Sequence, residues 1–216
     1  MEVSRNKWSG SRLKSKEIQL TDSQLDFLKT GRLYSRTEVL SKPCPVPSEP
    51  HVYAWFFQNP PSIIPIDDCL ERDGLTLLYV GISPKSPTKS GKPSPRRLKE
   101  RVRHHFQGNA YGSTLRLSLG CLLKSDLEIQ LRRVGSGRRM TFTPYGEEAL
   151  SDWMDKNAFV TWITHEEPWV LEHTLIESLS LPLNIQDNSH HPFQKTLKAV
   201  RSDARSTAKD ISIFDS

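Results

Sequence analysis

Two short, uninterrupted runs of apolar residues constrain the fold of this chain more than any other feature. The first, VYAWFF at 52–57, ends at a Pro-Pro pair, and the second, LTLLYVGI at 75–82, follows an Asp-Gly turn. Runs of this length that are rich in β-branched and aromatic residues are typical of buried strands. They predict strands over 51–58 and 76–82, paired antiparallel, with a third strand over 159–164.

The N-terminal extension, residues 1–49, carries two helix signals. Thr21 with Gln24 and Ser35 with Glu38 have the spacing of capping boxes, in which two side chains satisfy the free backbone groups at a helix start. The extension is therefore predicted to form two short helices before a Pro-rich linker.

The central domain, residues 50–188, contains a basic insertion at 83–97 that is followed by a helical pattern. Leu98, Val102 and Phe106 recur at every fourth position, which places them on one buried face.

The rest of the chain carries weaker signals. Alternation over 127–134 predicts a further strand, and Pro168 is expected to open the last helix of the core. The polar tail at 189–216 is predicted to be either a loose arm or a docked helix.

Positive charge is concentrated in one part of the chain. Between Lys85 and Arg139 there are 14 Lys or Arg and 3 Asp or Glu, a local charge of +11 in a chain whose total is +5. Such asymmetry indicates a polyanionic partner, although runs of Lys and Arg also serve to keep a surface solvated. The arginines at 132, 133, 138 and 139 flank a predicted turn, and for them the second explanation stays open.

Several other classes of protein are not supported. No stretch approaches the ~18 apolar residues that span a bilayer, and the polar N-terminus lacks the apolar core of a signal peptide, so a cytoplasmic location is expected. The three cysteines form no CxxC pair and are odd in number, which argues against a disulfide framework or a zinc ribbon. Nucleotide-binding glycine loops and the HExxH metalloprotease motif are absent from the sequence.

Five short motifs occur in a defined order across residues 50–185. They are HVY with Tyr53, YVG with Tyr79, LKERV with Arg101 and then His105, EHTLI with Glu172, and PLN with Asn184. In this order and spacing the sequence resembles the GIY-YIG nuclease superfamily, and its long basic loop is similar to the restriction-enzyme branch. The resemblance implies an α/β (α+β) fold with a small, central, mainly antiparallel three-stranded sheet flanked by helices.

The resemblance also implies a chemistry, the metal-dependent hydrolysis of a DNA phosphodiester. Glu172 would be the only protein ligand of one Mg²⁺ or Mn²⁺ ion. Arg101 would stabilise the negative charge that grows on the phosphate in the transition state. Tyr53 would orient or deprotonate the attacking water, its pKa lowered from ~10 by the metal and Arg101.

The remaining site residues would assist. Tyr79 would bind water or the scissile phosphate, His105, with an ordinary pKa of ~6.5, would move protons, and Asn184 would support the site. One departure from the family pattern is His51, which stands where the first motif has glycine. The residues expected to bind DNA phosphates are Lys85, Lys89, Lys92, Arg96, Arg97 and Arg116.

Alternatives remain at this point. Within enzymes, a structure-directed repair nuclease or a mobile-element nuclease is the alternative to a restriction-like or stand-alone enzyme. Cutting both strands would require a homodimer or two successive nicks. A non-catalytic DNA-binding module on the same fold is the alternative from another class. It predicts binding that depends on salt but not on Glu172 or Mg²⁺.

Overall fold

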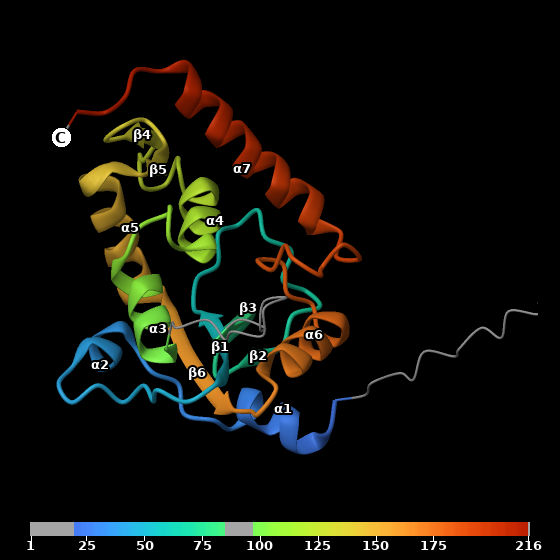
Figure 1. Cartoon of the computed structure of the whole chain (residues 1–216). Coiled ribbons are helices and arrows are strands. Elements are labelled where there is room, and N and C mark those ends of the chain that lie inside the picture. The colour runs from blue at the N-terminus through green and yellow to red at the C-terminus, as the bar shows by residue number, and fades with distance from the viewer. Residues whose placement is uncertain (1–19, 85–96, 216) are drawn as a thin grey trace, which may run out of the picture.

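A strand made entirely of buried residues, β1 (His51–Phe57), runs through the centre of the computed structural model, which describes residues 20–84 and 97–215 (Figure 1). Its neighbours β3 and β6 both pair with it antiparallel. The sheet has four strands in the order β2-β3-β1-β6, not the three predicted, because a two-residue strand pairs with the beginning of β3. The other strands of this sheet are β2 (Glu71–Arg72), β3 (Leu75–Ser83) and β6 (Ala158–Thr164).

The side chains of β1 alternate between two cores. Tyr53, Trp55 and Phe57 belong to the larger core, which is completed by residues from α2, α3, α4, α5 and α7. Val52 and Phe56 point to the opposite face, where α1 and α6 cover the sheet. Strands buried on both faces read as continuous apolar runs, which explains why the sequence pattern is so strong.

Seven helices surround the sheet within the described residues. Both N-terminal capping boxes are formed, and the C-terminal tail contains a long helix that packs on α4 and β4 (Figure 1). No helix in residues 20–84 and 97–215 has the length and apolar character needed to cross a membrane. The helices are α1 (Asp22–Lys29), α2 (Arg36–Leu40), α3 (Leu98–Gln107), α4 (Thr114–Leu122), α5 (Thr143–Asn157), α6 (Pro168–Ser178) and α7 (Phe193–Asp210).

The strand predicted over 127–134 is shorter than expected. Turns continue from the end of α4, with the Ile129 amide donating to the Lys124 carbonyl, and only β4 (Arg132–Val134) is extended. It pairs with β5 (Arg139–Thr141) in a separate two-stranded hairpin.

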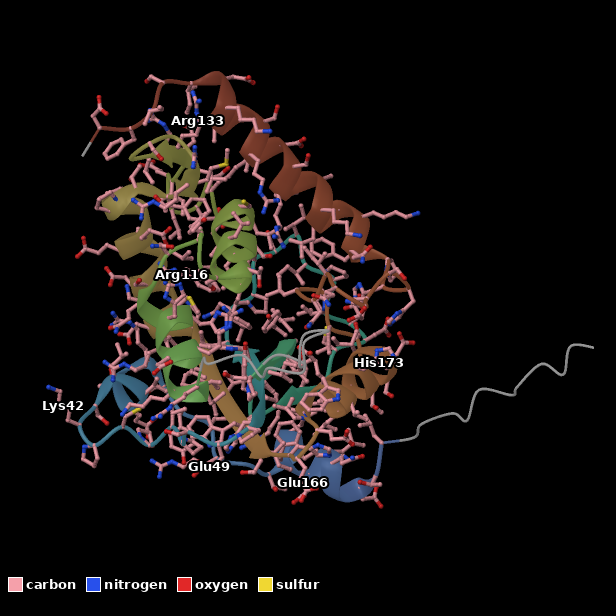
Figure 2. All side chains as sticks on the ribbon, in the orientation of Figure 1. Lys42, Glu49, Arg116, Arg133, Glu166 and His173 are labelled. Atoms are coloured by element: carbon pink, nitrogen blue, oxygen red, sulfur yellow. The ribbon has the colours of Figure 1, made fainter. Side chains whose placement is uncertain are left out.

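Arg133 holds α7 to this hairpin. Its Nε donates to the Ala208 carbonyl at 3.0 Å and its Nη2 to the Ile211 carbonyl at 2.7 Å, near the C-terminal end of α7 (Figure 2). Carbonyls at a helix C-terminus lack partners within the helix and carry partial negative charge, so a guanidinium is favourable there. The arginine therefore has a structural contact in place of the phosphate contact expected of the basic segment.

Candidate active site

The two motif tyrosines lie side by side on one face of the sheet. Tyr53 on β1 is opposite Gly81 on β3, and Tyr79 lies two residues along β3 on the same face, with the two rings 6.5 Å apart. A Cβ at Gly81 would lie 2.6 Å from Tyr53 Oη and 2.7 Å from Cζ. The glycine of the YVG motif therefore provides the space in which the Tyr53 ring crosses β3.

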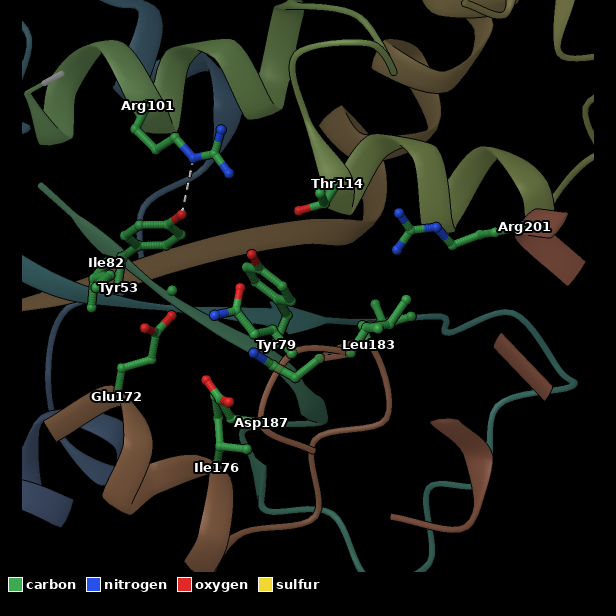
Figure 3. A pocket seen from close by; sticks show the side chains of 14 residues that line it. Tyr53, Tyr79, Ile82, Arg101, Thr114, Glu172, Ile176, Leu183, Asp187 and Arg201 are labelled. Atoms are coloured by element: carbon green, nitrogen blue, oxygen red, sulfur yellow. Dashed lines mark hydrogen bonds between the residues drawn. The ribbon is translucent and has the colours of Figure 1, made fainter. Parts of the chain in front are cut away.

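Arg101 reaches this pair from α3. Its Nε donates to Tyr53 Oη at 3.3 Å, and its Nη1 donates to the Gly112 carbonyl at 3.1 Å (Figure 3). Two contacts on a planar guanidinium fix its orientation as well as its position. The cation is thus held above Tyr53 at the wall of a cavity of about 340 Å³.

His105, one helical turn after Arg101, lies beneath the site and is completely buried. Its Nε2 lies 3.1 Å from Tyr53 Oη, and its Nδ1 lies 2.7 Å from Ser113 Oγ. Ser113 caps α4, where its Oγ also accepts from the Arg116 amide. The helix cap, the imidazole and the phenol therefore form one continuous hydrogen-bonded chain.

Burial shifts the pKa values of His105 and Tyr53 away from those expected. Burial, and then the positive charge of Arg101, lowers the pKa of His105 well below its ordinary value, so the imidazole is neutral at pH 7. Burial, reinforced by Tyr79, raises the pKa of Tyr53, and Arg101 opposes this only in part. In the protein alone, burial therefore opposes both expectations, that of a histidine that titrates near neutrality and that of a tyrosine whose pKa is lowered by its surroundings.

The acidic wall of the cavity comes from α6 and from the loop before α7. Glu172 on α6 and Asp187 in the loop before α7 both line the cavity, with their carboxylates facing the tyrosines (Figure 3). In the described part of the chain no group of three or more His, Cys, Asp and Glu side chains could hold a metal. One or two carboxylates beside an open cavity fit Mg²⁺ or Mn²⁺, since Mg²⁺ commonly keeps several waters and takes few protein ligands.

Asn184 closes the exposed edge of β3 next to Tyr79. Its Oδ1 accepts from the Val80 amide and its Nδ2 donates to the Val80 carbonyl, both at 2.9 Å. Because β2 covers only the beginning of β3, these backbone groups would otherwise lack a neighbouring strand. The side-chain amide takes the place of a peptide group there, and the same loop carries Asp187 into the cavity.

Arg116 is expected from the sequence to bind DNA, and the structure shows that this expectation is wrong. The side chain is fully buried and forms an ion pair with Glu147 at 2.8 Å (Figure 2). The same guanidinium donates to the carbonyls of His105, Phe106 and Glu147 and to Ser151 Oγ. With its donors directed at protein oxygens in the interior, Arg116 joins α3, α4 and α5 and has no access to a phosphate.

The other predicted phosphate contacts divide into two groups. Arg97 is exposed at the start of α3, one turn before Arg101. Lys85, Lys89, Lys92 and Arg96 lie outside the described residues.

His51 is buried and has no contact with the cavity. Its Nδ1 lies 2.6 Å from the Glu49 carbonyl and its Nε2 lies 2.9 Å from Thr164 Oγ1, so the ring links β1 to β6.

Among the cavity residues that were not predicted from the sequence are Thr114, Asp187 and Arg201. Thr114 begins α4, Asp187 follows Asn184 by three residues, and Arg201 extends from α7 into the cavity (Figure 3). The only available signal for Asp187 was its closeness to the PLN motif. The sequence contains no signal for Arg201, because α7 reaches the site only through its packing on α4.

Comparisons with known proteins agree with this geometry. The model of a family described as the GIY-YIG catalytic domain matches residues 51–203, well over half of the chain. No curated protein and no solved structure matches the chain.

Proposed function

The chain belongs to the GIY-YIG catalytic domain family, and on that premise we propose that it is a DNA endonuclease that depends on Mg²⁺ or Mn²⁺ and cuts at the cavity described above. The observation that carries the proposal is the convergence of all the predicted site residues except buried His105 on one cavity, from four different elements and a loop. These residues are Tyr53, Tyr79, Arg101, Glu172 and Asn184.

Arg101 is proposed to stabilise the transition state. Its acceptors at Tyr53 and Gly112 are neutral, so they hold the guanidinium in place without cancelling its charge. A preorganised cation at the point where phosphate charge increases lowers the barrier with no reorganisation during the reaction.

Tyr53 is proposed to orient the attacking water. In the tautomer with a proton on Nδ1, His105 donates to Ser113 and leaves Nε2 to accept from Tyr53 Oη. With Arg101 donating to the same oxygen at 3.3 Å, the phenol oxygen has a fixed position from which it orients the attacking water.

Glu172 would hold the metal ion, with Asp187 nearby on the same wall. When bound, the ion supplies Lewis-acid polarisation of the phosphate and charge neutralisation at the leaving oxygen. Glu172 requires a position at which it can reach both the ion and the substrate, and its half-buried place at the cavity wall meets that requirement.

The experiment uses supercoiled and linear DNA with Mg²⁺ and compares the wild-type protein with Glu172→Gln. Glu177→Gln is the matched control, since Glu177 is an exposed carboxylate on the same helix and does not line the cavity. We expect nicks or discrete fragments with the wild type and the control, and none with Glu172→Gln or with EDTA. Salt-sensitive binding without any cutting would instead support the non-catalytic module.

A further inference from the structure

A second cavity of about 270 Å³ adjoins the first and is lined by three arginines. The two cavities share Thr114 and Arg201 in their walls. Arg205, one turn further along α7, and Arg138, from the turn of the β4–β5 hairpin, also line the second cavity. We call this cavity the arginine cleft and define it by Arg138, Arg201, Arg205 and Tyr111 at its rim.

The arginines of the cleft differ from those with a structural role. Within residues 20–84 and 97–215, none of the three lies within ion-pair distance of a carboxylate. In the same part of the chain, the one side-chain hydrogen bond from this set is Arg201 Nη1 to Ser118 Oγ on α4, at 3.5 Å. That contact steadies Arg201 and leaves most of its donors able to bind an anion.

The cleft is also electrostatically unfavourable while empty. Burial, and then the charge of Arg205, lowers the pKa of Arg201, which means that two like charges are held close together in a partly desolvated place. An anion between them would remove this repulsion, and a phosphodiester presents two oxygens that match the guanidinium fork.

Tyr111 gives the cleft an aromatic surface. It is 64 % exposed, which is unusual for a large side chain, and it lies between the Arg101 acceptor Gly112 and the preceding Ala110, just before α4 begins. Exposed aromatic rings beside cationic grooves stack on unpaired bases of single-stranded nucleic acids.

We propose that the arginine cleft binds the backbone phosphate next to the scissile one on the same DNA strand, and that Tyr111 stacks on the base attached to it. This inference rests on the proposed nuclease function and adds to it. The strand would pass from Glu172 and Arg101 in the first cavity, across Thr114 and Arg201, into the cleft. Stacking on Tyr111 requires an unpaired base, so DNA with single-stranded character beside the cut is the favoured substrate.

Binding measurements test the cleft apart from catalysis. In the Glu172→Gln protein, the double variant Arg138→Ala/Arg205→Ala is compared with Lys195→Ala, which removes one exposed charge from α7 outside the cleft. Fluorescence anisotropy with a labelled single-stranded oligonucleotide, repeated across salt concentrations, gives Kd and its salt dependence. We expect the double variant to raise Kd at least tenfold and to reduce the slope of log K against log salt by about 0.7 for each phosphate that it no longer neutralises.

Stacking is tested with a second matched pair. Tyr111→Ala is compared with Tyr145→Ala, since Tyr145 is 68 % exposed and lies on α5 outside the cleft. We expect Tyr111→Ala to weaken binding of the single strand at least fivefold and of a duplex of the same sequence much less, because only an unpaired base can stack on the ring. Thermal melting of each variant establishes that it is folded.

The outcomes separate the two proposals. If the wild type cuts DNA and the cleft variants bind with unchanged Kd and salt slope, phosphate binding by the arginine cleft is refuted and the nuclease function stands. If the wild type binds without cutting and the cleft variants bind weakly, DNA binding by the arginine cleft is supported and the nuclease function fails. A wild-type protein that neither binds nor cuts DNA refutes both.

Discussion

Gly81→Ala tests whether the position of Tyr53 controls the site. Gly81 does not have a positive φ, so alanine is compatible with its backbone conformation. The added methyl group would lie 2.6 Å from Tyr53 Oη, 2.7 Å from Cζ and 3.0 Å from Cε2. These separations are too short for carbon and oxygen atoms, so the ring must move by about 1 Å to reach ordinary van der Waals contact.

The magnitude follows from where the ring can go. Tyr53 is 1 % exposed and packed in the larger core, so the movement strains a filled interior, which costs about 1–3 kcal/mol. At about 2–4 °C for each kcal/mol in a chain of this size, the melting temperature falls measurably while the protein stays folded. The same movement disrupts the hydrogen bonds of Tyr53 Oη to Arg101 Nε at 3.3 Å and to His105 Nε2 at 3.1 Å. A displacement of about 1 Å can reduce the rate about 100-fold.

The assay pairs DNA cleavage at saturating substrate with thermal or urea unfolding. We expect kcat to fall about 100-fold in Gly81→Ala while most molecules remain folded at the assay temperature. Tyr53→Phe provides the control, because it keeps the ring and removes the oxygen, and the double variant should be little worse than either single variant. A Gly81→Ala protein that cuts DNA at nearly the wild-type rate would refute the argument that the Tyr53 hydroxyl must be fixed by Arg101 and His105.

Three further predictions follow from burial and charge. Arg116→Ala should lower the free energy of unfolding by about 3–5 kcal/mol in urea titrations, because it leaves the largely desolvated Glu147 carboxylate without its cation. Weaker DNA binding with unchanged stability would contradict this. The lowered pKa of His105 means that the unfolded chain gains a proton below pH ~6.5 that the native protein does not, so stability falls on acidification. His105→Gln should flatten that slope by up to ~1.4 kcal/mol per pH unit in denaturation measured from about pH 7.5 to 5, and an unchanged slope would show that His105 is not the group responsible. Asp187→Asn should raise the Mg²⁺ concentration for half-maximal cutting severalfold, since it removes a carboxylate from the cavity wall; an unchanged Mg²⁺ titration would place Asp187 outside the metal site.

Most of the fold could be predicted because its signals are local. The capping boxes at Thr21 and Ser35 are complete within four residues, and the buried strands are visible as continuous apolar runs. β2 was missed because two polar residues carry no periodicity, and its existence depends on pairing with the start of β3. The strand expected over 127–134 is formed only at Arg132–Val134, because the alternating residues before it continue the turns after α4.

Five of the residues that line the cavity could be predicted from the sequence, but their electrostatics could not. Motif order identifies Tyr53, Arg101 and Glu172 because each sits at a fixed place on a strand or helix. The low pKa of His105 depends on how completely the surrounding helices bury it, and that is a property of the packed structure. The place of Arg201 in the cavity could not be predicted for a related reason, since a helix far along the sequence brings it there.

The arginines show most clearly what the sequence could not determine. Arg101, Arg116 and Arg133 all lie in the basic segment and carry the same group, yet they meet different acceptors. Arg116 meets the Glu147 carboxylate, and Arg133 meets helix-terminal carbonyls, so both have structural roles. Arg101 is held by a phenol and a single carbonyl, which fix its direction and leave its charge to act on a substrate. A cation becomes available for chemistry when its protein acceptors are few and neutral, and those acceptors are set by tertiary contacts rather than by neighbouring residues.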